Sequence, residues 1–128
     1  MFSKKIRILI VDDSDVVRGA IRALLQEEKE RSEAYESGDA EGAIEKAHEI
    51  KPEVILLDMS LPGVSGVELA KRFRDSFPGA KIILMSAQDP MVLHKLTELA
   101  GLQMCIAKTE LSTELLPMLG KIASDAVS

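Results

Sequence analysis

The chain has 128 residues, enough for one domain with a hydrophobic core that needs no disulfide or metal to stabilise it. Its formal net charge of −5 argues against direct binding of nucleic acid, and it has no apolar run long enough to span a membrane. The single cysteine, Cys105, excludes an intrachain disulfide and favours a reducing compartment. We therefore expect one cytoplasmic domain over residues 1–128, with no membrane as a partner.

Five short segments are predicted to be strands, over residues 6–11, 32–37, 54–57, 81–85 and 104–107. The first, third and fourth are apolar almost throughout, which is typical of strands covered on both faces of a parallel sheet. The second has only Ala34 and Tyr35 as apolar residues, so we expect an edge strand or a frayed one.

Five stretches with apolar residues at helical spacing lie between and after these strands. Asp89 and Pro90 predict the start of the fourth helix, Gly101 its end, and residues 78–79 the end of the third. Pro117 must lie near the first turn of the last helix or kink it, and residues 124–128 are expected to be loose. The predicted inward stripes are Val17, Ile21, Leu24, Leu25; Ala40, Ala43, Ile44, Ala47; Val67, Leu69, Ala70, Phe73; Leu93, Leu96, Leu99, Ala100; and Leu115, Leu116, Leu119, Ile122.

Strict alternation of strands and helices predicts an α/β fold, a doubly wound (βα)5 flavodoxin-like sandwich around a five-stranded parallel sheet. In such a sheet the carboxyl ends of the strands share one edge, where ligands bind. Asp12 and Asp13 follow the first strand, Asp58 the third, Ser86 the fourth and Lys108 the fifth. An aspartate after a strand is often only the N-cap of the next helix, but five such residues at four strand ends are not explained in that way.

Crowded carboxylates repel one another unless a cation lies among them, and oxygen ligands with open positions suit Mg²⁺. A carboxylate can also accept a phosphoryl group covalently. The pattern therefore predicts a Mg²⁺ site at this edge, able to receive a phosphoryl group.

Four motifs in this order resemble the receiver domain of two-component response regulators: VDDSDVVRGAIRALL, VILLDMSLPGVSGVEL, IILMSAQ and AGLQMCIAKTE. The resemblance covers essentially the whole chain. It implies that Asp58 accepts a phosphoryl group from a histidine kinase or a histidine phosphotransfer protein. It also implies that Lys108 pairs with the phosphoryl oxygens, and that Ser86 moves to bond one of them.

By the same resemblance, Asp13, Asp58 and the backbone carbonyl of Ser60 would bind Mg²⁺ directly, and Asp12 mainly through water. Ser60 and Gln88 would line the route of the water that removes the phosphoryl group. The protein would be a signalling switch in a phosphorelay, and no enzyme beyond catalysing its own phosphorylation and dephosphorylation. Its output would be a change in a partner-binding face within residues 90–122.

Three positions depart from the usual family pattern. Thr109 follows Lys108 where proline is usual, Cys105 stands where Tyr or Phe is common, and Ser86 replaces the commoner threonine. Cysteine is too small to act as the swinging aromatic of the family. We therefore expect Ser86 to act mainly on its own loop and on the helix that begins at Pro90.

The sequence leaves several alternatives to a switch without an attached output domain. A small Mg²⁺-dependent phosphohydrolase would use the same acids, but it commonly carries a second acid where Ser60 stands. A flavin-binding module would need a phosphate-cradling loop after the first strand, where acids stand instead. A receiver that binds partners without phosphorylation would not need the full set of acids and lysine.

Overall fold

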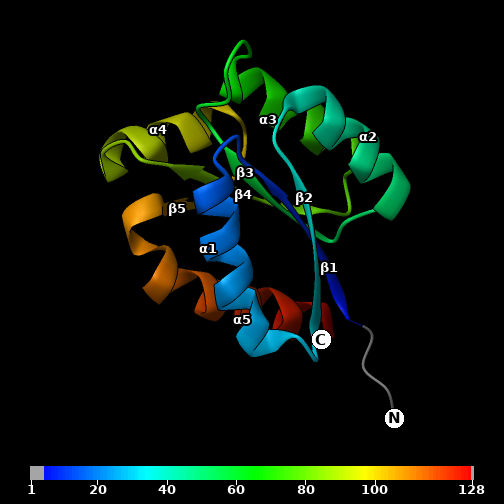
Figure 1. Ribbon diagram of the computed structural model, residues 1–128. Coiled ribbons are helices and arrows are strands. Elements are labelled where there is room, and N and C mark those ends of the chain that lie inside the picture. Colours follow the sequence, from blue (N-terminus) through cyan, green and yellow to red (C-terminus); the bar gives the residue numbers. More distant parts are fainter. Residues whose placement is uncertain (1–4, 128) are drawn as a thin grey trace.

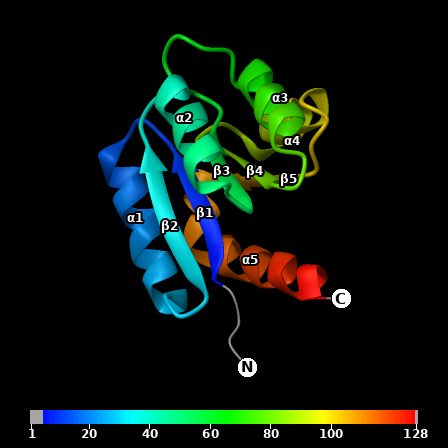
Figure 2. The ribbon, with the colours of Figure 1, turned by 90° about the vertical axis from the view of Figure 1, so that its right-hand side faces the viewer.

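A parallel sheet of five strands forms the centre of the protein, with helices on both faces (Figures 1 and 2). The computed structural model describes residues 5–127. The strands are β1 (Ile6–Val11), β2 (Ser32–Ser37), β3 (Val54–Asp58), β4 (Lys81–Ser86) and β5 (Met104–Ala107). The helices are α1 (Asp15–Leu25), α2 (Ala40–Ile50), α3 (Gly66–Ser76), α4 (Pro90–Leu99) and α5 (Leu111–Val127), with short 3₁₀ turns η1 (Gln26–Glu28) and η2 (Lys108–Glu110).

The strands lie in the order β2-β1-β3-β4-β5, and every neighbouring pair is parallel. This is the flavodoxin-like order, and it confirms the predicted doubly wound fold. The apolar-poor β2 is an edge strand, as its composition predicts. The order of strands reverses between β1 and β3, so a crevice at the carboxyl ends of these two strands is the expected binding place.

Two hydrophobic clusters lie on opposite faces of the sheet. Leu9 and Val11 of β1 point into the cluster beneath α2, α3 and α4, whereas Ile8 and Ile10 point into the cluster beneath α1 and α5. The two helix layers are seen on either side of the sheet in Figure 1. Because side chains alternate along a strand, a continuous apolar run fills both clusters at once. Polar side chains are therefore accommodated where the strands end.

Side-chain caps start four helices near the carboxyl edge of the sheet. Ser14 accepts a hydrogen bond from the Val17 amide, and Asp89 accepts one from the Met91 amide, with Pro90 in the first turn of α4. Asp39 and Ser65 cap α2 and α3 in the same way. The predicted start of the fourth helix is thus confirmed, and strand ends and helix starts meet at one edge.

Three details differ from the sequence-based expectations. Leu99 is 58% exposed, because the buried face of α4 is formed by Leu93, Thr97 and Ala100. The hydroxyl of Thr97 can be buried since it donates a hydrogen bond to the Leu93 carbonyl at 2.7 Å. Pro117 is the seventh residue of α5, beyond the first turn, and the helix continues through it. Residues 124–127, expected to be loose, belong to α5, while residue 128 lies outside the described residues.

Candidate functional site

The residues predicted at the strand ends converge at the carboxyl edge of the sheet. Asp12 directly follows β1, Asp58 ends β3, Ser86 ends β4 and Lys108 directly follows β5. The first three are completely buried, and the side chain of Lys108 is 19% exposed. The sheet hydrogen bonds continue past the strands, since the Asp12 amide donates to the Ser37 carbonyl at 3.1 Å. The backbone that carries these groups is therefore held by the sheet itself.

The same local turn occurs at three strand ends. Asp12 Oδ1 accepts a hydrogen bond from the Ser14 amide at 2.9 Å, and Asp58 Oδ1 accepts one from the Ser60 amide at 2.9 Å. Ser86 Oγ accepts one from the Gln88 amide at 3.0 Å. Aspartate and serine form such bonds readily because their short side chains reach the backbone two residues ahead. Each turn orients one side chain of the site.

The loop after Asp58 depends on glycine. A Cβ on Gly66 would lie 2.4 Å from the carbonyl oxygen of Met59, which is closer than real Cβ atoms approach. Gly63 in the same loop has a φ of 77°, in the left-handed region that favours glycine. The start of α3 therefore packs directly against the backbone next to Asp58, and a side chain at residue 66 would push the two apart.

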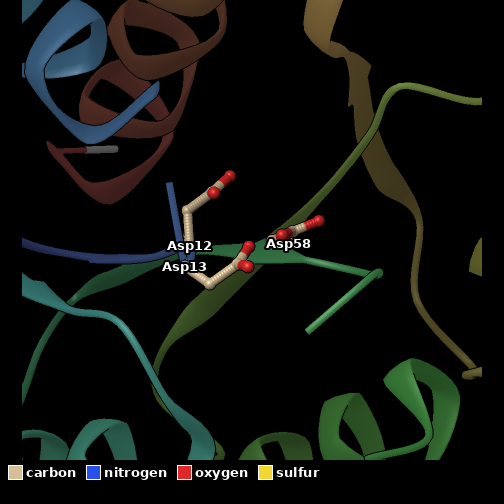
Figure 3. A group of neighbouring side chains, drawn as sticks. All are labelled: Asp12, Asp13 and Asp58. Carbon is tan, nitrogen blue, oxygen red and sulfur yellow. The ribbon is translucent and has the colours of Figure 1, made fainter. Parts of the chain in front are cut away.

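Three carboxylates meet at this edge, on neighbouring ends of β1 and β3 (Figure 3). Oxygen atoms of Asp12, Asp13 and Asp58 all lie within 4.8 Å of one another, with Asp13 exposed and the other two buried. Lys108 Nζ lies 2.8 Å from Asp12 Oδ2 and 3.3 Å from Asp58 Oδ1. One lysine faces three acids, so the group is left with a formal charge of about −2 when all are ionised.

The electrostatics of the group favour an added cation. Burial raises the pKa of Asp58 above its ordinary value and the charge of Asp12 adds to this effect, while the Ser60 amide and Lys108 oppose it. Burial works to lower the pKa of Lys108, but the hydrogen bonds and charges of Asp12 and Asp58 outweigh it, so this pKa is raised. Lys108 is therefore charged at neutral pH, and the ionised form of Asp58 needs further positive charge.

The donor set fits a hard divalent cation. The only polar partner of the buried Oδ2 of Asp12 in residues 5–127 is Lys108 Nζ, at 2.8 Å. A carboxylate oxygen can accept two hydrogen bonds, so this oxygen can still bind an ion or the water that an ion carries. Carboxylates with open positions beside them are the ligands that Mg²⁺ prefers.

The family model of the response regulator receiver domain matches residues 8–119. The chain belongs to the response regulator receiver domain family. The transcriptional regulatory protein YxjL of Bacillus subtilis, named as uncharacterised, is 34% identical over 89 residues, which cover 70% of this chain and 41% of that protein. The response regulator VraR of Staphylococcus saprophyticus is 30% identical over 112 residues, 86% of this chain and 53% of the relative. This receiver chain thus spans about half of the length of these relatives, or less.

Solved structures of receiver domains have the same fold. A putative response regulator from Chloroflexus aurantiacus is 26% identical, with a TM-score of 0.84 over 94% of this chain and 99% of that one. The isolated receiver domain of RcsB from Salmonella enterica, solved with the phosphomimetic BeF3-, also has a TM-score of 0.84 at 21% identity, over 94% of this chain and 90% of that chain. The second likeness concerns the fold alone.

Family membership confirms the predicted resemblance, and it places this chain among the receiver domains that serve as signalling switches in two-component systems. The match to the receiver family favours this assignment over the phosphohydrolase and flavin-binding alternatives. Receiver domains bind Mg²⁺ at an acidic pocket and interact with histidine kinases and downstream effectors, and this receiver has its cluster of aspartates at the corresponding sheet edge. No helix within residues 5–127 is long and apolar enough to cross a membrane.

The departures from the family pattern have structural consequences near β5. Thr109 lies within η2, which begins at Lys108, directly after the last residue of β5. Cys105 is half-buried, and its Sγ lies 3.6 Å from Nδ1 of His94 on α4. Where the family often has an aromatic ring, this receiver has a small side chain in polar contact with α4.

Arg18 was not among the residues predicted for the site. This residue lies on α1 within the first family motif, and its guanidinium donates a hydrogen bond to the backbone carbonyl of Asp12. The available signal was a charged side chain one turn after the helix cap Ser14. Its partner on β2, Glu36, is 18 residues away and is revealed only by the fold.

Proposed function

We propose that this receiver domain is a phosphorylation-activated switch that acts in the cytoplasm and accepts a phosphoryl group on Asp58 from a histidine kinase or a histidine phosphotransfer protein. One observation carries the proposal. Asp58 is buried, its Oδ1 is held by the Ser60 amide and Lys108, and no hydrogen bond from residues 5–127 reaches its Oδ2. A carboxylate with one fixed and one free oxygen is oriented for attack.

In the transfer step, Asp58 Oδ2 attacks the phosphorus atom of a phosphohistidine. The O–P bond forms, the N–P bond breaks, and the imidazole leaves with the electron pair. Mg²⁺, when bound, supplies positive charge to the acids and to the incoming phosphoryl oxygens. Asp13, Asp58 and the Ser60 carbonyl are the proposed direct ligands, with Asp12 acting mainly through water.

Lys108 and Ser86 are proposed to bind the transferred group. Lys108 Nζ already lies 3.3 Å from the nucleophilic carboxylate, so it can follow the phosphoryl oxygens and neutralise their charge. The Ser86 hydroxyl oxygen accepts a hydrogen bond from the backbone amide of Gln88. The hydroxyl hydrogen itself has no acceptor within residues 5–127. Donation of this hydrogen to a phosphoryl oxygen would draw the loop at residues 87–89 towards the site and shift the start of α4.

Two different surfaces are proposed for the two partners. A groove of about 580 Å³ between α1 and the start of α5 runs beside Lys108, and Val16 on its rim is 81% exposed. This apolar groove next to the phosphoacceptor suits the phosphodonor protein. The output face, within residues 90–122, carries exposed Met91, Val92 and Leu99 on α4 and suits a downstream protein.

Phosphorylation by a small acyl phosphate in the presence of Mg²⁺ tests this function. Intact mass should increase by one phosphoryl group in the wild type and stay unchanged in Asp58→Asn. Asp75→Asn is the matched control, because Asp75 is exposed on α3 and pairs with Arg74, away from the site. Equal labelling of wild type and Asp58→Asn would contradict the proposal, as would a wild type that takes up no phosphoryl group.

A further inference from the structure

Arg18 connects α1 to the acidic edge and to the edge strand β2. Its side chain is only 16% exposed. The guanidinium donates to the Asp12 carbonyl through Nη1, to Glu36 Oε1 through Nε at 3.0 Å, and to Asp15 through Nη2. An arginine held by all three nitrogens has a fixed orientation, because the planar guanidinium matches its acceptors as a rigid fork.

We propose that Arg18 is a positioning residue for the Mg²⁺ site, acting through the backbone of the turn that carries Asp12 and Asp13. The inference rests on the proposed function, in which this acidic group binds Mg²⁺. Glu36 orients the guanidinium, and the guanidinium holds the Asp12 carbonyl.

The effect of Arg18 falls on Asp13. The Asp12 side chain has its own restraints, from the Ser14 amide and from Lys108. The side chain of Asp13 has no hydrogen bond or ion pair within residues 5–127, so only its backbone places it. The Asp12 carbonyl and the Asp13 amide belong to one planar peptide unit. Holding the carbonyl therefore restrains the position of the Asp13 Cα, from which the carboxylate projects.

Gly38 shows how closely the chain covers this contact. A Cβ at residue 38 would lie 3.2 Å from Arg18 Nη1 and 3.8 Å from the Asp12 carbonyl oxygen. The segment between β2 and α2 thus passes directly over the guanidinium. Gly38→Ala would push the guanidinium by a few tenths of an ångström without removing its charge, which provides a second, independent perturbation.

The two possible roles of the Arg18 charge predict opposite results. A cation near three acids competes with Mg²⁺, so a purely electrostatic role predicts tighter Mg²⁺ binding in Arg18→Ala. A positioning role predicts weaker binding, and it predicts that Arg18→Lys, which keeps the charge but lacks the fork, does not restore it.

Arg22 offers a matched control on the same helix. It pairs with the same acid, Glu36, at 3.2 Å and donates to the Ala34 carbonyl of β2. It makes no contact with Asp12 in the described residues. Arg22→Ala therefore removes the same charge and a contact with the same strand, but leaves the acidic turn in place.

The experiment is a Mg²⁺ titration of purified protein followed by the backbone amide resonances of Asp13 and Asp58, with folding checked by circular dichroism. We expect about 10-fold weaker Mg²⁺ binding in Arg18→Ala and in Arg18→Lys, in line with supporting residues of other metal sites. Gly38→Ala should weaken binding in the same direction, and Arg22→Ala should stay within about twofold of the wild type. If Arg18→Ala does not fold, Gly38→Ala decides the question.

Unchanged or tighter binding in folded Arg18→Ala would overturn the inference, and so would equal weakening in Arg22→Ala. Unchanged binding in Gly38→Ala would overturn it where Arg18→Ala does not fold. Each of these results leaves the proposed function standing if the wild type binds Mg²⁺ and is phosphorylated. A wild type that binds no Mg²⁺ would contradict both.

Discussion

Replacing Asp58 by asparagine is expected to stabilise the metal-free protein while abolishing its stabilisation by Mg²⁺. Asp58 is 1% exposed, and its carboxylate lies within 4.8 Å of that of Asp12. With an effective dielectric constant of about 20, the two carboxylates repel each other by about 3.5 kcal/mol. The attraction between Asp58 and Lys108, at 3.3 Å, is about 5 kcal/mol. Removing a carboxylate from water costs several kcal/mol more, so the balance opposes the charge.

The direction of the Asp58 pKa agrees with this balance and sets the pH dependence. Burial raises this pKa above the ordinary value of 3.8, so the folded protein binds the proton more tightly than the unfolded chain. The cost of ionising Asp58 is therefore absent below about pH 4 and grows as the pH rises through the raised pKa. Asparagine has no such cost and keeps an oxygen for the Ser60 amide. We expect Asp58→Asn to gain about 1 kcal/mol at pH 7 in EDTA, and less as the pH falls.

Thermal unfolding by circular dichroism measures both effects. For a dissociation constant of about 1 mM, Mg²⁺ at about 10 mM stabilises the wild type by about 1.4 kcal/mol, because the unfolded chain has no site. That corresponds to an increase of about 4–6 °C in Tm for a domain of this size. Asp58→Asn should show an increase below about 1 °C, and Asp75→Asn should behave like the wild type. A lower Tm of Asp58→Asn in EDTA, or an undiminished response to Mg²⁺, would refute this reasoning.

Three further predictions concern the loop, the lifetime of the phosphorylated state and the output. Gly66→Ala should lower the free energy of unfolding by about 2 kcal/mol in chemical denaturation, because its Cβ would lie 2.4 Å from the Met59 carbonyl oxygen. Gln88→Ala should slow dephosphorylation at least about threefold in a phosphate-release assay, since a side-chain amide can hold and orient the attacking water. In NMR spectra, a phosphoryl mimic with Mg²⁺ should cause smaller amide shift changes in α4 of Ser86→Ala than in α4 of the wild type. The shift changes beside Asp58 should be the same in both proteins.

Each of these has a control or an opposing result. Gly19→Ala, on α1 with open space around its added Cβ, should not destabilise the protein. An unchanged dephosphorylation rate in both Gln88→Ala and Ser60→Ala would show that neither residue orients the water. Equal shift changes in wild type and Ser86→Ala, or a response near Cys105 as large as that of α4, would contradict the proposed output.

The strands and the acidic edge were predictable because both follow from local sequence. Four of the five strands begin and end within one residue of apolar runs, and β2, which lacks such a run, was predicted to be an edge strand or a frayed one. The meeting of Asp12, Asp58 and Lys108 follows from parallel strands ending at one edge, since each polar residue directly ends or follows an apolar segment. A polar residue at the carboxyl end of a strand lies at the binding crevice because all the strands run in the same direction.

Only the tertiary structure decided which side chains pair and which helix faces are buried. Helical spacing allowed Leu99 to face inward, but the packing of α4 on the sheet buries Thr97 instead. The hydroxyl of Thr97 tolerates this burial because it donates a hydrogen bond to the Leu93 carbonyl. Lys108 pairs with Asp12 as well as Asp58 because β1 and β3 are neighbours. Arg18 meets Glu36 because β2 lies beside β1. Such contacts join residues far apart in the chain, so they depend on strand order and register, which no local pattern encodes.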